Sequence, residues 1–376
     1  MSPTPRIEAF LLLGRNQSCS DLHFTVGLPP LVRQDGELTP LRYREMTSEE
    51  IQLLLSEILS LTQQQELMER GSVDISYQSQ TIGRFRINAC RQLRGLSVVC
   101  RVIPDKVPQL AELGLPSILK EFTTLSSGLV LVTGGTGTGK STTLAAMVNE
   151  INQRDSLTII TLEDPIEFQH ESKASLVIQR ELGEHVPSFH AGLQRALRQD
   201  PDVILVGELR DHETIAAAIE ASETGHLVFG TLHTRGAYQT LHRILDAFPA
   251  ESQDQIRFTL AENLKAVVCQ DLVRTAERRG RRAVAEVLVM TPAVAQLLRD
   301  GKTHQLPSVM ATGRRQGMQL LDQELLILVQ AGEIDPDDAF LKASDKREFI
   351  MYVEKPELLQ LIEGSVIGAD ASRRVA

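Results

Sequence analysis

Short apolar runs alternate with amphipathic stretches through the middle of the chain. Four runs have the length and residue types of buried strands: GLVLVTG, LTIITLEDP, DVILVGE and HLVFGTLH. Two further stretches, STTLAAMVNEIN and FHAGLQRALRQ, carry apolar residues at helical spacing. This alternation predicts an α/β fold in which helices cover a mostly parallel sheet.

The first hundred residues have a different pattern. The stretch VDISYQSQTIGRFRINACRQL alternates apolar and polar positions in strand-like runs. Thr47 and Glu50 form a capping-box pattern in front of IQLLLSEIL, which predicts the start of a helix. These features predict a small α+β domain over residues 1–103.

The boundaries of the remaining parts follow from changes in composition. The polar, proline-containing stretch PDKVPQLAELGLPS predicts a linker over residues 104–117. We expect the α/β domain over residues 118–340 and a C-terminal extension over residues 341–376. The last third of the chain is predicted to be mostly helical, because GMQLLDQELLILVQAG has its apolar residues at helical spacing.

The basic run ERRGRR, from Glu277 to Arg282, has two interpretations. It could bind nucleic acid or anionic lipid, or it could be an exposed turn. The apolar runs on either side of it favour the exposed turn of a hairpin.

Composition and charge argue against several classes of protein. The 376 residues include 39 Lys and Arg against 49 Asp and Glu, a formal net charge of −10, which argues against a protein that coats nucleic acid. The four cysteines contain no C-x-x-C pair, so we expect reduced, mostly buried thiols and neither a zinc knuckle nor a disulfide framework. No apolar run approaches the length that spans a bilayer, which predicts a cytoplasmic protein.

The stretch GLVLVTGGTGTGKSTT is the strongest chemical signal. Its G-x-x-x-x-G-K-S pattern lies between a predicted strand and a predicted helix, the context of a phosphate-binding loop. Backbone N–H groups of such a loop hold phosphates, the lysine pairs with the β and γ phosphates, and the serine hydroxyl binds Mg²⁺. The predicted ATP-binding residues are Gly134, Gly135, Thr136, Gly137, Thr138, Gly139, Lys140, Ser141 and Thr142.

Three chemically active residues follow other predicted strands. Glu163, Glu208 and His233 each come at or just after the carboxyl end of a strand. Ligands of open parallel sheets bind at that edge, so we expect all three near Lys140. Glu163 and Glu208 are candidates for the group that activates water and for a role beside Mg²⁺.

The stretch TGHLVFGTLHT raises the alternative of a metal site, because it has a histidine near each end. His226 and His233 are seven positions apart, so on a strand they point to opposite faces, about 20 Å apart. They are therefore too far apart to share an ion. His233 is expected at the ligand edge, and His226 at the opposite end in a structural or coupling role.

Four ordered motifs resemble those of the secretion-type hexameric ATPases. GGTGTGKSTT, TLEDPIEF, DPDVILVGELRD and TGHLVFGTLHT match that family's Walker A, Asp box, Walker B and His box. SDLHFTVGLPP, GRFRINAC, PAVAQLLRDGK and GMQLLDQEL are most similar to the PilT and PilU branch, the type IV pilus retraction ATPases. The resemblance implies a PAS-like N-terminal domain, a RecA-like P-loop domain and a homohexamer with ATP between the two domains.

The resemblance also implies roles for individual residues. Glu163 would be the general base, Glu208 the Walker B acid that holds Mg²⁺ directly or through water, and His233 a sensor of the γ-phosphate. Arg86 and Arg101 would reach the phosphates from the N-terminal domain; without the resemblance, each would be taken for a surface charge. Gly135 and Thr138 replace the family's commoner Pro and Ser, and both are compatible with the loop.

The implied function is the retraction of type IV pili and twitching motility. The implied partner is the inner-membrane platform protein of the pilus, through which the chain would reach the inner face of the cytoplasmic membrane. The extra N-terminal region and four-cysteine zinc site of assembly and type II secretion relatives are not found, which favours retraction. The long tail after Ala339 resembles the accessory paralogue, so an accessory motor working with a paralogous ATPase is an alternative. A regulatory ATP-binding scaffold with little turnover and a nucleic-acid motor are the alternatives from other classes.

Overall fold

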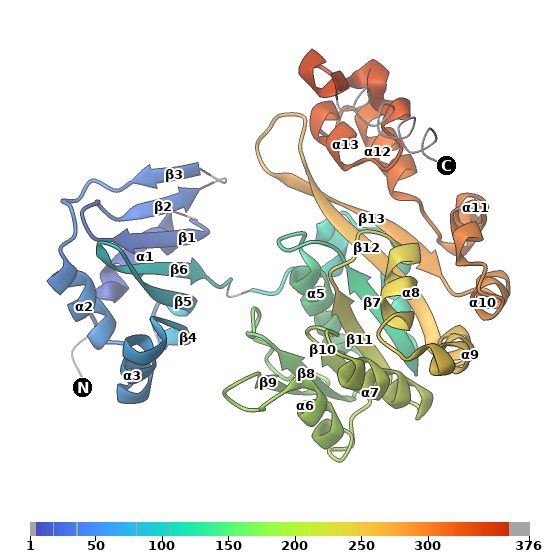
Figure 1. The fold of residues 1–376 in the computed structure, drawn as a ribbon, viewed down its shortest axis with the longest axis horizontal. Helices are drawn as coiled ribbons and strands as arrows, with labels where there is room; N and C mark the ends of the chain where they lie inside the picture. Colours follow the sequence, from blue (N-terminus) through green and yellow to red (C-terminus); the bar gives the residue numbers. More distant parts are fainter. Residues whose placement is uncertain (1–4, 18, 35–36, 80, 105, 361–376) are drawn as a thin grey trace, which may run out of the picture. The chain divides into compact units, whose positions relative to one another are not determined.

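The protein is described here by a computed structural model that covers residues 5–17, 19–34, 37–79, 81–104 and 106–360. The chain divides into two compact units, Met1–Lys106 and Val107–Ala376, each built around its own sheet (Figure 1). Residues 361–376 of the predicted C-terminal extension lie outside the described residues. Within the predicted linker, Leu110 is buried against the second unit, so that part of the stretch is packed.

In the described part of the first unit, an antiparallel sheet is accompanied by three helices. Its strand order is β3-β2-β1-β6-β5-β4. The strands are β1 (Asp21–Thr25), β2 (Leu31–Gln34), β3 (Glu37–Pro40), β4 (Ser72–Ser79), β5 (Gly83–Gln92) and β6 (Gly95–Val102). The helices are α1 (Ile7–Asn16), α2 (Ser48–Ser56) and α3 (Leu61–Arg70). This arrangement confirms the predicted α+β fold of the N-terminal part.

Local sequence accounts for these elements. Thr47 and Glu50 form the predicted capping box at the start of α2, with each side chain accepting the other residue's backbone N–H. Along β5, Phe85, Ile87 and Ala89 are fully buried while the residues between them are partly exposed. This period of two gives the sheet one apolar face toward the helices and one polar face.

The second unit has a seven-stranded sheet in the order β13-β12-β7-β11-β10-β8-β9. All neighbours are parallel except the β12–β13 hairpin, which confirms the predicted α/β class. The strands are β7 (Gly128–Thr133), β8 (Thr158–Glu163), β9 (Leu176–Glu181), β10 (Val203–Val206), β11 (Leu227–Leu232), β12 (Leu264–Arg274) and β13 (Arg281–Val289). The edge strand β9 has no counterpart among the predicted strands.

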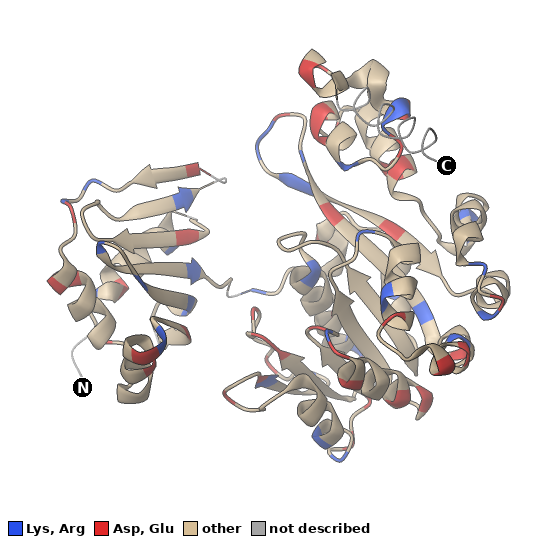
Figure 2. Cartoon of the chain, viewed as in Figure 1, with Lys and Arg blue, Asp and Glu red and all other residues tan. Residues whose placement is uncertain are grey.

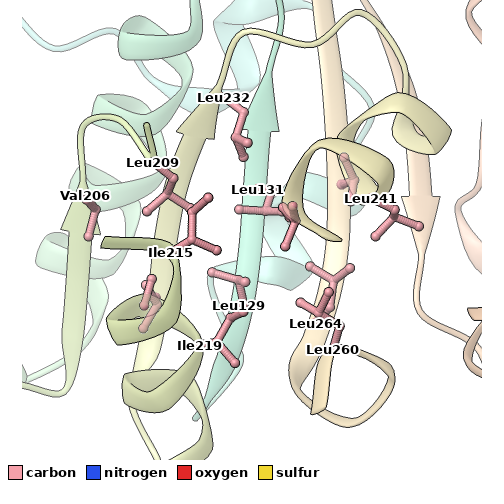
Figure 3. Close-up of a cluster of buried hydrophobic side chains, with 14 of the residues drawn as sticks. Leu129, Leu131, Val206, Leu209, Ile215, Ile219, Leu232, Leu241, Leu260 and Leu264 are labelled. Atoms are coloured by element: carbon pink, nitrogen blue, oxygen red, sulfur yellow. The ribbon is translucent and has the colours of Figure 1, made fainter. Parts of the chain in front are cut away.

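Helices cover both faces of this sheet (Figure 1). Along β7, Leu129 and Leu131 belong to one buried cluster, and Val130 and Val132 to the other. The second cluster is covered by α4 (Ile118–Phe122) and α5 (Lys140–Arg154). The first is covered by α6 (Phe189–Ala196), α7 (His212–Glu223), α8 (Ala237–Leu245), α9 (Gln253–Asn263), α10 (Pro292–Arg299) and α11 (Leu306–Thr312). Figure 3 shows apolar side chains of α7, α8 and α9 packed on strands of this face.

The C-terminal helices pack on the β12–β13 hairpin. They are α12 (Leu321–Gln330) and α13 (Pro336–Lys342), followed by 3₁₀ turns at Lys346–Tyr352 and Pro356–Leu359. A separate core joins Phe340 and Phe349 to Val273 and Val284 of the hairpin. The remaining 3₁₀ turns are Leu110–Leu113, Ala250–Ser252, Thr303–Gln305 and Arg314–Gln316.

The ERRGRR run forms the exposed hairpin turn that the sequence predicts. Arg278 donates to Asp335 at 2.8 Å, and Arg282 pairs with Glu333 at 3.1 Å. These arginines therefore connect the hairpin to the C-terminal helices. Elsewhere, Lys and Arg lie interspersed with Asp and Glu on both units (Figure 2). None of the described helices is both long enough and apolar enough to cross a membrane.

Candidate active site

The phosphate loop joins the carboxyl end of β7 to the first residue of α5. Lys140 begins the helix and is 9% exposed, and its Nζ donates to the carbonyl oxygens of Gly134 and Gly135 at 2.8 Å each. Burial lowers the pKa of Lys140, although the charges of Glu208 and Glu167 oppose this effect. The N–H groups at the start of α5 and the lysine together form an anion-binding end of the helix.

A cavity lies beside this helix start, at the carboxyl ends of the central strands. Ser141 lines it from α5, Glu163 from the end of β8, and Glu208 from the segment after β10. Glu167 and His170 line it from the loop that follows β8. Ligands of open parallel sheets bind at the carboxyl ends of the strands, and this strand-end rule correctly places both predicted acids at one site with the phosphate loop.

The carboxylate of Glu163 is held by two neighbours. Its Oε1 accepts hydrogen bonds from Thr161 Oγ1 at 2.6 Å and from Gln179 Nε2 at 3.1 Å. Thr161 is on the same strand, whereas Gln179 is on β9. The edge strand therefore orients the acid that lines the cavity.

Glu208 lies between an arginine and a histidine. Arg210 Nη2 lies 2.7 Å from its Oε2, and His233 Nε2 lies 3.3 Å from its Oε1. Burial alone would raise the pKa of Glu208, but the hydrogen bond and charge of Arg210, helped by His233, bring it below its ordinary value. Glu208 is therefore a carboxylate at neutral pH, and His233 reaches the site through it.

The histidine pair is separated by β11. His233 follows the strand at the site edge, and His226 precedes it at the opposite end. His226 Nδ1 lies 2.9 Å from the carbonyl oxygen of Ala221, at the end of α7. Among the residues that the structure describes, there is no group of three or more His, Cys, Asp or Glu arranged to hold a metal ion.

Arg86 and Arg101 lie on the sheet of the first unit. They face each other across β5 and β6 on its polar face. Arg101 Nε donates to Asp21 Oδ1 at 2.9 Å, and Arg86 Nε lies 3.9 Å from Asp74 Oδ1. The two arginines are thus brought together, each with an acidic neighbour in the same unit.

Several residues of the site were missed in the sequence. Arg210 follows Glu208 by two positions, and a search for cations beside the strand-end acids would have found it. No local sequence pattern marks Gln179 or His170 as site residues. The edge strand β9 brings Gln179 to the cavity, and the loop before that strand brings His170. Burial lowers the pKa of His170 to about 4, with a smaller effect of Lys173, so this ring is neutral at physiological pH.

The residues present fit a magnesium–nucleotide ligand by their chemistry. A helix start with a buried lysine suits phosphates, while the Ser141 hydroxyl and the ionised Glu208 are oxygen ligands of the kind Mg²⁺ prefers. Arg210 and His233 hold the Glu208 carboxylate by its two oxygens, in the way that outer partners orient metal ligands.

Known proteins similar to this chain include three bacterial proteins. A twitching motility protein of Neisseria gonorrhoeae is 47% identical over 84% of this chain and 84% of its own length. In Pseudomonas aeruginosa, the type IV pilus retraction ATPase PilT is 43% identical over 91% of this chain and 99% of its own length. The type IV pilus ATPase PilU of the same organism is 40% identical over 92% of this chain and 91% of its own length.

A solved structure and a family model agree with these similarities. The crystal structure of the pilus retraction motor PilT with bound ADP superposes with a TM-score of 0.85 at 41% identity, covering 92% of this chain and 98% of that one. The family model described as type II/IV secretion system protein matches residues 32–339. The chain therefore belongs to the type II/IV secretion system protein family.

Proposed function

We propose that this chain is an ATP-hydrolysing motor that powers the retraction of type IV pili and hence twitching motility. The observation that carries the proposal is the meeting of the phosphate loop, Glu163, Glu208 and His233 at one edge of a RecA-like sheet. The similarity of 91% of the chain to a retraction ATPase, and of 92% to a solved retraction motor, supports the pilus as the object moved.

The phosphate loop would bind the triphosphate. Gly134 to Thr142 would supply backbone N–H groups and hydroxyls, and Lys140 would exchange its two carbonyl partners for phosphate oxygens. Burial favours this exchange, because the attraction between an ammonium group and a phosphate is stronger in a partly desolvated site than in water.

Ser141 and Glu208 would hold Mg²⁺, directly or through water. A bound magnesium ion would offset negative charge on the phosphates. The contribution of the chain itself is the arrangement around Glu208, whose two oxygens face Arg210 and His233. His233 would thereby respond to changes at the γ-phosphate by way of the Walker B acid.

Glu163 would accept the proton of the attacking water. Thr161 and Gln179 hold its carboxylate at the cavity, which is the positioning that a general base needs. Burial alone would raise the pKa of Glu208, but Arg210 lowers it, so this acid stays an ionised carboxylate and would serve as the metal-side ligand.

The second unit would not work alone. In a homohexamer, Arg86 and Arg101 would add positive charge to the phosphates from the first unit. Loss of the γ-phosphate would then weaken the link between units and let them swing about the segment near Pro104–Pro116. Equal inter-unit geometry in ATP-bound and ADP-bound hexamers would contradict this coupling.

The pilus platform protein in the inner membrane would receive the motion. The motor would then work in the cytoplasm at the inner face of that membrane, touching lipid only through this partner. Magnesium, the hexamer and the platform contact can each be tested in the purified protein. The measurements are metal dependence of turnover, the mass of the assembly, and co-purification with the platform protein.

Two measurements test the function itself. Purified protein should release phosphate from ATP, and Lys140→Ala should abolish the release; a wild-type protein without turnover would favour the regulatory scaffold. Deletion of the gene in its host should leave excess surface pili without motility, because pili would still be assembled. Loss of pili would instead indicate an assembly motor.

The accessory role is the second candidate. The observation in its favour is a folded segment beyond residue 340, whose Phe349 packs against Phe340. Pilus retraction can be measured in a host from which all paralogous retraction ATPases have been deleted, and the result distinguishes the two roles. Retraction by this chain alone would make it a primary motor, and retraction only beside a paralogue would make it an accessory. Strong stimulation of turnover by DNA would revive a nucleic-acid motor, which the net charge of −10 disfavours.

A further inference from the structure

Gln270 lies behind the phosphate loop and belongs to none of the recognised motifs. It is on β12, which runs parallel to β7, the strand that leads into the loop. Cys269 is level with Thr133 in that pairing, so Gln270 comes level with the first residue of the loop. Its side chain is 4% exposed, which is unusual for a glutamine and calls for hydrogen-bond partners.

Both ends of the Gln270 amide are satisfied by the nucleotide-binding segment. Nε2 donates to the carbonyl oxygen of Thr138 at 2.8 Å, and Oε1 accepts from Thr143 Oγ1 at 2.7 Å. Thr138 is in the loop just before Lys140, and Thr143 is in the first turn of α5. The buried Gln270 amide therefore links the loop to the first turn of α5, on either side of Lys140.

Two glycines of the loop pack directly against the same residue. A Cβ atom at Gly134 would lie 2.3 Å from the backbone oxygen of Gln270, and one at Gly139 would lie 2.8 Å from its Nε2. By contrast, a Cβ at Gly137 would meet nothing within 4 Å. The close approach of the β12 backbone thus leaves no room for a side chain at Gly134. Gly139 has a φ of +89°, which favours glycine, and it packs against the Gln270 amide.

We propose that Gln270 is a positioning residue that holds the phosphate loop in its binding conformation before nucleotide arrives. The inference rests on the proposed nucleotide binding and adds to it a residue that touches the loop rather than the ligand. A loop that is ordered before binding loses less conformational entropy when the nucleotide binds. The contribution of Gln270 should therefore be measurable as a higher affinity for nucleotide. Loss of the amide would also leave Thr138 and Thr143 with unpaired buried groups.

The first test compares Gln270→Ala with Gln319→Ala. Gln319 is a matched control, since its Nε2 also donates to a backbone carbonyl, that of Ala285 at 2.8 Å, but away from the loop. Titration of the full-length chain with a fluorescent ADP should give a Kd about tenfold higher or more for Gln270→Ala and an unchanged Kd for Gln319→Ala. Turnover at saturating ATP should change less than kcat/KM.

A second readout needs no nucleotide. Hydrogen exchange of the backbone amides from residue 135 to residue 141 should become faster in Gln270→Ala and stay unchanged in Gln319→Ala. Unchanged exchange and unchanged Kd in a variant with a normal melting temperature would overturn the inference.

Gln270→Glu supplies a pH signature. Its carboxylate would repel the Thr138 carbonyl, whereas the protonated form would donate to it, so the loss of affinity should shrink as pH falls. Gln270→Ala should show no such recovery, and equal pH profiles for the two variants would count against the positioning role.

Two further variants keep the outcomes separate. If Gln270→Ala does not fold, Thr143→Val decides: it keeps the shape of Thr143, removes one of the two hydrogen bonds, and should raise Kd severalfold. An unchanged Kd in that variant would then overturn the inference. If the wild-type chain binds no nucleotide, or Lys140→Ala binds as well as wild type, the proposed function fails rather than the role of Gln270.

Discussion

Arg86 and Arg101 lie directly opposite each other on neighbouring antiparallel strands of the first unit. Asp21 is opposite Arg101 on the next strand, and Ser76 is opposite Arg86 on the other side, so four side chains form one row across the sheet. Like charges in facing positions destabilise a sheet. Asp21 pairs closely with Arg101, whereas Asp74 lies 3.9 Å from Arg86 and is exposed, so it offsets the second charge less. The proposed contact of both arginines with the phosphates would account for this pairing.

Replacing either arginine should therefore impair hydrolysis without unfolding the domain. If they stabilise the transferred phosphate, Arg86→Ala should lower turnover by about 10³–10⁵-fold. Its cost in stability should be about 1 kcal/mol or less, because the Asp74 partner is 3.9 Å away and exposed. Phosphate release and thermal melting measure both effects, with the exposed Arg94→Ala as control; normal turnover in Arg86→Ala would reject the role.

Glu163→Gln should lose the chemical step and keep the substrate. The amide can still accept from Thr161, so the cavity keeps its shape, but it cannot take a proton from water. We expect kcat to fall by about 10²–10⁴-fold with little change in nucleotide affinity. Steady-state hydrolysis and ADP titration check this, and Glu171→Gln, an exposed residue of the same segment, is the control. A fall in affinity with normal kcat would contradict the assignment.

Arg210→Ala should shift the acid limb of the rate profile to higher pH. Arg210 lowers the pKa of Glu208 below its ordinary value, so in the wild type the carboxylate stays ionised as pH falls past that value. Without Arg210, burial raises the pKa with only His233 to oppose it. The same sign holds for stability, because the contribution of this pair is present at neutral pH and lost as pH falls through the folded-state pKa of Glu208.

The kcat/KM profile over pH measures this shift, with Arg198→Ala as control because that arginine is exposed and is not among the groups that shift the pKa of Glu208. An acid limb that does not move in Arg210→Ala would show that Glu208 does not control it.

Only one of the four thiols should react quickly in the folded protein. Cys19, Cys100 and Cys269 are buried, whereas Cys90 is partly exposed. Burial, with a smaller effect of Glu286, raises the pKa of Cys269 to about 12, and burial also raises the pKa of Cys19 and Cys100. A thiol reagent should titrate one cysteine in native protein and none in Cys90→Ser. Rapid modification of two or more would indicate that the buried strands open.

Much of the second unit could be predicted because its signals are local. The phosphate loop is a contiguous motif between a strand and a helix. The strands of the second unit are nearly continuous apolar runs, because helices cover both faces of the sheet. The strand-end rule then predicted that Glu163 and Glu208 would meet, since parallel strands bring their carboxyl ends to one edge. The capping box of α2 was predictable for the same reason, as its two residues are three positions apart.

The sequence by itself determined the fold class, the phosphate loop and the acids at the strand ends, because residues close in the chain or fixed by strand direction specify them. Only the tertiary structure decided that Gln179 orients Glu163, that Arg210 and His233 share Glu208, and that Arg86 faces Arg101. It also brought Gln270 to the loop from a strand more than a hundred residues away. The physical reason is that sheet order and register create these contacts, and neither is encoded in a contiguous pattern.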